Sequence, residues 1–238
     1  MVDVTQIVSG LAGFAPALAL LFYTLREYTY PRAQKPYFDD RKIFAFFALG
    51  IVLGMVMFAF EVYGQSISAE ETLIALVLGF ALMEELFKLV ILNFPRFQRK
   101  VDTAFCGLAM GLGISSTFTF ATVYSSLLGL EDPGALEMAA FSLLGLQLVL
   151  MHGATTAMIG VGVARGNIKP YFSEAVLVRI GYGLLMIPFF DPHPPFDIIG
   201  LAAATAVVVY AYQKVHRLSL PVLIADAKKG RKAKKIRK

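Results

Sequence analysis

Two glutamates and a lysine interrupt an otherwise apolar stretch, "ALMEELFKLVIL", at residues 81–92. On a helix, spacings of three and four residues bring Glu85 and Glu84 each within reach of Lys88. One ammonium group does not neutralise two carboxylates, so one of them needs either a proton or a second partner. A carboxylate in such surroundings can serve as a general acid or base, which is the chemistry that peptide hydrolysis requires.

A second apolar stretch, "LVLMHGATTAMIG", adds an imidazole at His152 and hydroxyls one turn later at Thr155 and Thr156. A carboxylate beside an imidazole can take a proton from water and return it to a leaving amine, while hydroxyls donate to the oxyanion. One histidine with two glutamates could instead hold a metal such as zinc, although three ligands on two helices favour this less. No other cofactor is implied. The segment between the two stretches, "GISSTFTFATVY", supplies further hydroxyls: Ser115, Ser116, Thr117, Thr119 and Thr122.

The elements that position these groups are membrane-spanning helices. Apolar residues make up 57% of the 238 positions and charged residues 16%, whereas soluble domains are roughly a quarter charged. The apolar residues form blocks of about twenty, enough to cross ~30 Å of hydrocarbon as a helix. We therefore expect an all-α polytopic bundle with one cysteine and no disulfide framework. Its seven predicted spans are 5–25, 43–63, 72–93, 102–128, 136–164, 175–190 and 195–214.

Basic residues predict the orientation of this bundle. All but two of the 22 Lys and Arg residues fall in alternate loops and in the C-terminal segment, and the two exceptions are Lys88 and Arg179. Because cationic loops stay cytoplasmic, the N-terminus is expected outside and the C-terminus inside. Residues 1–216 would form the bundle. Residues 217–238 would form a basic cytoplasmic tail that binds anionic lipid at about 1 kcal/mol per basic residue, with RNA as the weaker alternative.

The depth of the polar groups predicts that they meet. An ionisable side chain at the bilayer centre costs about 2.5–3.5 kcal/mol, so such groups face the bundle interior. Glu84 lies twelve residues from the outer end of its predicted span, and His152 lies sixteen residues into a longer span of the same direction. We expect Glu84, Glu85 and His152 to share one level with the hydroxyls. Arg179 should snorkel to the inner interface, and Glu61 should reach head-group water at the outer end.

The order of these motifs resembles the PrsW family of glutamate-dependent intramembrane proteases, in the CAAX protease and Abi superfamily. "EELFK" resembles the family motif EExxK, and a basic loop, the Gly-rich "FCGLAMGLG" and the His-bearing "LMHGATTAMIG" follow in family order, so the resemblance covers about residues 20–166. It implies an intramembrane peptidase that cleaves membrane-embedded or membrane-tethered proteins. Glu84 and Glu85 match the motif glutamates, one of which activates water. Lys88 matches the motif lysine, and His152 the assisting histidine.

The chain also departs from the family pattern. Family members usually carry another glutamate in the Gly-rich span, where this chain has Phe118 or Phe120, depending on the alignment. The chain would therefore be a divergent member of the family. We expect it in the plasma membrane of a prokaryote. Two alternatives stay open: a catalytically inactive PrsW-like subunit or scaffold that binds other membrane proteins, and a small proton-coupled transporter that uses the buried charges as a relay. Nucleic acid is not an expected partner of the bundle.

Overall fold

The structure is a computed structural model, and it describes residues 4–33, 36–67, 72–130, 134–190 and 194–236. All regular elements in these ranges are helical, which confirms the predicted all-α class for the described residues. A short 3-10 turn, Arg26–Tyr28, follows the first helix, and a π-helical turn, Val215–Ser219, links the last two. The α-helices are α1 Val4–Leu25, α2 Asp40–Ile67, α3 Leu73–Leu92, α4 Asp102–Leu128, α5 Ala135–Arg165, α6 Ile168–Phe190, α7 Phe196–Lys214 and α8 Leu220–Ile236.

Six helical stretches in the described ranges are long and apolar enough to cross a membrane, as in an integral membrane protein. The helix α3 is not among the six, because it carries Glu84, Glu85 and Lys88 although it is long enough. The third predicted span, 72–93, coincides with α3, so the count of seven stays a prediction. The six stretches are Val4–Tyr28, Asp40–Ile67, Asp102–Leu128, Ala135–Arg165, Ile168–Phe190 and Phe196–Lys229.

The start of α6 differs most from its predicted limit. The helix begins at Ile168, whereas apolarity alone suggested 175. Gly166 ends α5 in the left-handed conformation, with φ 69°, which is the usual role of glycine at a helix C-terminus. Pro170 then lies in the first turn of α6, where its missing N–H group leaves no hydrogen bond unmade. The first two turns of α6 are thus helical but too polar to have been counted as part of a span.

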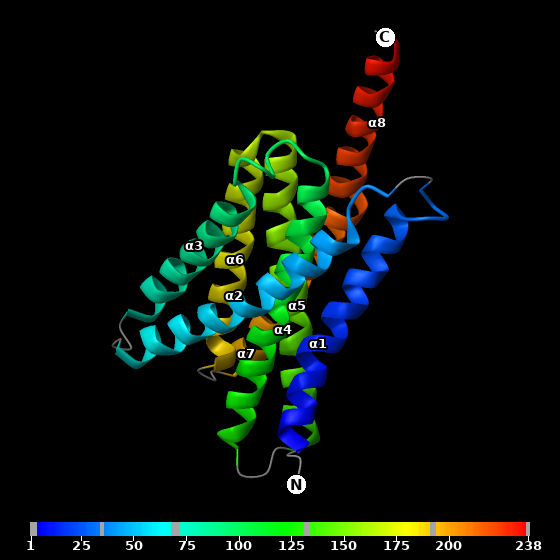
Figure 1. The fold of residues 1–238 in the computed structure, drawn as a ribbon. Coiled ribbons are helices and arrows are strands. Elements are labelled where there is room, and N and C mark those ends of the chain that lie inside the picture. The colour runs from blue at the N-terminus through cyan, green and yellow to red at the C-terminus, as the bar shows by residue number, and fades with distance from the viewer. Residues whose placement is uncertain (1–3, 34–35, 68–71, 131–133, 191–193, 237–238) are drawn as a thin grey trace.

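The helix α4 forms the centre of the bundle, with α1, α2 and α5 packed around it (Figure 1). Every residue from Thr103 to Thr119 is buried. Small residues allow this close packing. A Cβ atom on Gly111 would overlap the carbonyl oxygen of His152 on α5, and one on Gly54 of α2 would overlap Thr117. The backbone contact between α4 and α5 therefore fixes the position of the turn of α5 that bears His152.

The helix ends alternate between the two ends of the bundle. The C-terminal ends of α1, α3 and α5 lie at one end together with α8, which protrudes beyond it, and the start of α1 and the C-terminal end of α4 lie at the other (Figure 1). The predicted boundary between bundle and tail, at residues 216–217, falls within the π-helical turn. The start of α8 still packs on the bundle, since Leu220, Leu223 and Ile224 are buried.

Candidate functional site

Lys88 joins α3 to α5 at the middle of the bundle. Its ammonium nitrogen lies 2.7 Å from Glu85 Oε1, 3.1 Å from His152 Nδ1 and 3.3 Å from Thr155 Oγ1. The side chains of Lys88 and Glu85 are both 0% exposed, and His152 and Thr155 are equally buried. The structure thus brings together four of the residues that the sequence singled out.

The contact with Lys88 determines the hydrogen-bonding roles of His152. An ammonium group has only donors, so Nδ1 must accept and the imidazole proton must sit on Nε2. Nε2 of His152 and Oε2 of Glu85 are both buried, and neither has a hydrogen-bond partner among the described residues. Buried polar atoms nearly always have a partner, either protein or water. The cluster therefore offers one unpaired donor and one unpaired acceptor, a combination that suits a bound water, which can donate and accept at once.

Glu84 does not share Lys88 with its neighbour, contrary to the expectation from spacing. Its carboxylate accepts two hydrogen bonds from Arg179 of α6, with Nε at 2.7 Å from Oε2 and Nη2 at 3.2 Å from Oε1. Successive residues on a helix point about 100° apart. Glu85 therefore faces α5 while Glu84 faces α6, and each acid has its own cation.

The prediction that Arg179 snorkels to the inner interface is wrong. Arg179 is 6% exposed and lies eleven residues after Ile168, the first residue of α6. The prediction placed it one turn into its span because the polar start of α6 had been left out. Arg179 is therefore the second partner that the pair of glutamates needs.

The predicted hydroxyls divide into two groups. Thr155 contacts Lys88, and Thr119 is buried with no partner for its hydroxyl among the described residues. Three of the others do not reach the Lys88 cluster as donors, because each donates to a carbonyl oxygen of its own helix and so satisfies itself locally. These are Ser115, Ser116 and Thr156.

Phe118, one of the two positions considered in the sequence for a further acid, packs against the imidazole. Its ring centroid lies 5.3 Å from that of His152. Phe120, the other position considered, stacks on Tyr124 instead, with ring centroids 5.7 Å apart. Phe118 is the residue that the alignment based on the glycines selects. It is therefore this alignment whose aromatic residue contacts the imidazole.

A cavity of about 790 Å³ lies beside this cluster, between the last part of α2, the first part of α3 and the facing parts of α4, α5 and α6. Phe118 forms part of its wall, so the same ring contacts both His152 and the cavity. Glu61 and Arg179 also line it. The expectation that Glu61 reaches head-group water is wrong for its Oε2 atom, which is buried and unpaired among the described residues.

Arg179 and Glu61 are the site residues whose roles sequence reasoning missed. The sequence did single out Arg179, because Arg179 and Lys88 are the two basic residues that lie outside the basic loops and the C-terminal segment. Glu61 gave a weaker signal, since an acid six residues before the end of a helix is ordinary at a membrane surface. Only the arrangement of five helices around one cavity reveals that its side chain turns inward.

A metal centre gains no support from the geometry. Among the described residues, no group of three or more His, Cys, Asp or Glu side chains could hold an ion. Glu84 turns to Arg179, which leaves Glu85 and His152 as the remaining pair, with Lys88 between them.

Comparison with known proteins supplies no relative: no family model matches the chain, and neither a curated protein nor a solved structure matches it. The fold and the site together define a helical membrane protein. Its site is a buried cluster of a carboxylate, an ammonium group and an imidazole, and the cluster lies next to a cavity. Any further assignment depends on the chemistry of that cluster.

Proposed function

We propose that the chain is an intramembrane peptidase related to the PrsW family, acting on membrane-embedded or membrane-tethered proteins. The observation that carries the proposal is the pair of unpaired atoms on either side of Lys88. Glu85 Oε2 is an acceptor and His152 Nε2 a donor, both are buried, and both belong to residues held by the same ammonium group. A water that reaches both atoms would satisfy them, because it donates to Oε2 and accepts from Nε2–H.

In this scheme Glu85 is the general base. It takes a proton from water while the water oxygen bonds to the substrate carbonyl carbon, and His152 Nε2–H donates to the oxyanion that forms. When the carbon–nitrogen bond breaks, Glu85 returns the proton to the leaving amine. Lys88 donates to Glu85 and favours its ionised form, and it holds His152 in the tautomer with its proton on Nε2. Glu84 and Arg179 act through position, because their ion pair ties α3 to α6.

The proposal includes seven spans with the N-terminus outside and the C-terminus in the cytoplasm. Counting α3 as a span is supported by its 20 residues and by its charges, each of which has a partner inside the bundle. The orientation is supported by the basic loops that follow α1, α3 and α5, helices whose C-terminal ends lie on the same side as α8. We propose the plasma membrane of a prokaryote as the location, with anionic lipid bound at the basic residues after 216.

A second candidate is a PrsW-like subunit that binds membrane proteins without cutting them. Phe118 favours it, because an aromatic ring stands where the family resemblance calls for an acid and also separates His152 from the cavity. For cleavage, this ring must move aside. For binding alone, it can stay where it is.

A cleavage assay separates the two candidates. Purified protein in detergent is incubated with a panel of single-span reporter proteins, and the products are mapped by mass spectrometry. Glu85→Gln and His152→Ala should each reduce the rate at least 100-fold, in line with the ~10²–10⁴-fold contribution of acid–base groups. Glu137→Gln is the matched control, since it removes an exposed carboxylate at the start of α5.

Full activity in Glu85→Gln would rule out the assignment. The second candidate predicts that the wild-type chain cuts none of the reporters. It also predicts that a protein which co-purifies with the wild type still co-purifies with Glu85→Gln.

A further inference from the structure

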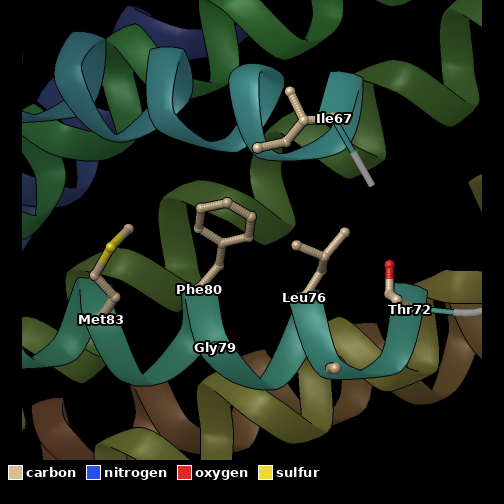
Figure 2. Close-up of a pocket in the computed structure, with 7 residues that line it drawn as sticks. Ile67, Thr72, Leu76, Gly79, Phe80 and Met83 are labelled. Atoms are coloured by element: carbon tan, nitrogen blue, oxygen red, sulfur yellow. The ribbon is translucent and has the colours of Figure 1, made fainter. Parts of the chain in front are cut away.

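The cavity beside the Lys88 cluster has a route to the lipid. A second hollow of about 500 Å³ lies between α2 and α3, and Thr72 is the one polar residue among the described residues that line it. Figure 2 shows Ile67 of α2 facing Leu76, Phe80 and Met83 of α3 across it. The two hollows share Leu76 and Phe80. The larger cavity therefore borders on a gap through which an apolar molecule in the bilayer can approach.

Phe80 narrows this route. Its ring stands in the gap between the two helices (Figure 2) and packs so closely on Gly64 of α2 that a Cβ atom there would overlap the ring. A rotamer change of the Phe80 side chain would widen this gap, and such changes are fast compared with movements of whole helices.

The charges around the cavity do not balance. Lys88 pairs with Glu85, and Arg179 pairs with Glu84. Glu61 is a third acid on the cavity side without a cation of its own, and its Oε2 has no partner in the part of the chain that the structure describes. A carboxylate against apolar walls is unfavourable unless a cation or a proton joins it. Glu61 therefore needs either a proton or a cation bound in the cavity.

The shape and depth of the cavity indicate what kind of cation fits. The cavity is within the ~300–1,000 Å³ typical of small-molecule sites, and most of its lining is apolar, including Phe58, Leu148 and Phe190. Glu61 lies six residues before Ile67, the end of α2, which corresponds to ~9 Å along the helix axis. A molecule with its charged end at Glu61 thus has that end near the head-group region and its chain among apolar side chains.

We propose that this cavity binds an amphiphile with a primary ammonium head group, which enters from the lipid between α2 and α3. The ammonium group donates to the Glu61 carboxylate, and the apolar chain lies along the cavity wall towards Phe118. This inference goes beyond the proposed peptidase function and does not rest on it, because binding at Glu61 requires no catalysis at Glu85.

The test is saturation binding of radiolabelled octylamine to the purified full chain in detergent, corrected for uptake by protein-free micelles. Glu61→Gln should bind octylamine at least tenfold more weakly, because it keeps the shape of the side chain but removes its charge. The exposed Glu137→Gln and the cluster variant Glu85→Gln should bind as the wild type does. Octyltrimethylammonium should bind more weakly than octylamine, because it carries the charge without an N–H donor.

A second variant guards against a folding defect in the first. Ser126→Trp fills part of the cavity from its wall without altering a charge and should also weaken binding. Wild-type affinity in Glu61→Gln, or no saturable binding to the wild type, would overturn the proposal. Loss of reporter cleavage in Glu85→Gln together with unchanged octylamine affinity would show that the two proposals stand separately.

The same assay in lipid nanodiscs identifies the source of the head group. If phosphatidylethanolamine competes with octylamine and phosphatidylcholine does not, the bound amphiphile is an aminolipid. If neither lipid competes, the site takes a free alkylamine, and the ammonium chemistry is unchanged.

Discussion

The ion pair between Arg179 and Glu84 gives the sharpest prediction about stability. The side chain of Arg179 is 8% exposed and that of Glu84 is 1% exposed. Removing one partner of a buried pair leaves an uncompensated charge and costs about 3–5 kcal/mol, whereas replacing both with neutral groups of similar volume is often nearly neutral. Arg179→Met should therefore lower the free energy of unfolding by ~3–5 kcal/mol. The double variant Arg179→Met with Glu84→Gln should be more stable than Arg179→Met alone.

Circular dichroism of mixed micelles with increasing SDS can measure this, since the chain has no tryptophan for fluorescence and its helices dominate the signal. Arg165→Met is the control, because the Arg165–Asp226 pair is 35% and 47% exposed, and such pairs contribute about 0–1 kcal/mol. The reasoning fails if Arg179→Met is no more destabilising than Arg165→Met. It also fails if the effects of Arg179→Met and Glu84→Gln simply add in the double variant.

Two further predictions concern packing and topology. Gly111→Ala should destabilise the bundle by ~1–3 kcal/mol relative to Gly10→Ala, because the new methyl group overlaps the carbonyl oxygen of His152, whereas nothing lies within 4 Å of a Cβ on Gly10. Thermal unfolding of both variants checks this, and equal shifts would contradict the packing described. In intact cells, a membrane-impermeant maleimide should label Gly129→Cys and leave Gln98→Cys unlabelled until lysis. The reverse pattern would invert the proposed orientation.

Much of the fold could be predicted because the bilayer imposes a simple rule on sequence. A helix needs about twenty apolar residues to cross the hydrocarbon, so the fourth helix was predicted to the residue, as Asp102–Leu128. The start of α6 could not be found in this way. Residues 168–174 are helical but polar. A measure of apolarity finds residues that lie in lipid, and it does not find helical residues outside the lipid. Because of this one error, the prediction placed Arg179 at the interface and not in the middle of the bundle.

The candidate site was predictable in part, for a different reason. Spacing along one helix identifies which residues are near each other, and it correctly indicated that Lys88 contacts Glu85. It does not say which neighbouring helix each side chain faces. Depth counted from span ends brought His152 to within about a turn of Glu84, and the structure has His152 Nδ1 3.1 Å from the ammonium nitrogen of Lys88, one turn further along α3. The rotation of α3 about its axis, which sends Glu84 to α6, depends on packing that involves all the helices.

The two adjacent glutamates therefore have different roles. The position of the Phe118 ring determines whether a substrate can reach the imidazole. Glu84 secures α3 to α6, while Glu85 carries the unpaired oxygen beside His152. That oxygen is fully buried, so neither a substrate nor bulk water reaches it while the wall of the cavity stays closed. Phe118 is the wall residue that contacts the imidazole. If the protein cleaves its substrates, this ring must move during each turnover. If the protein only binds them, the ring can stay in place as part of the cavity wall.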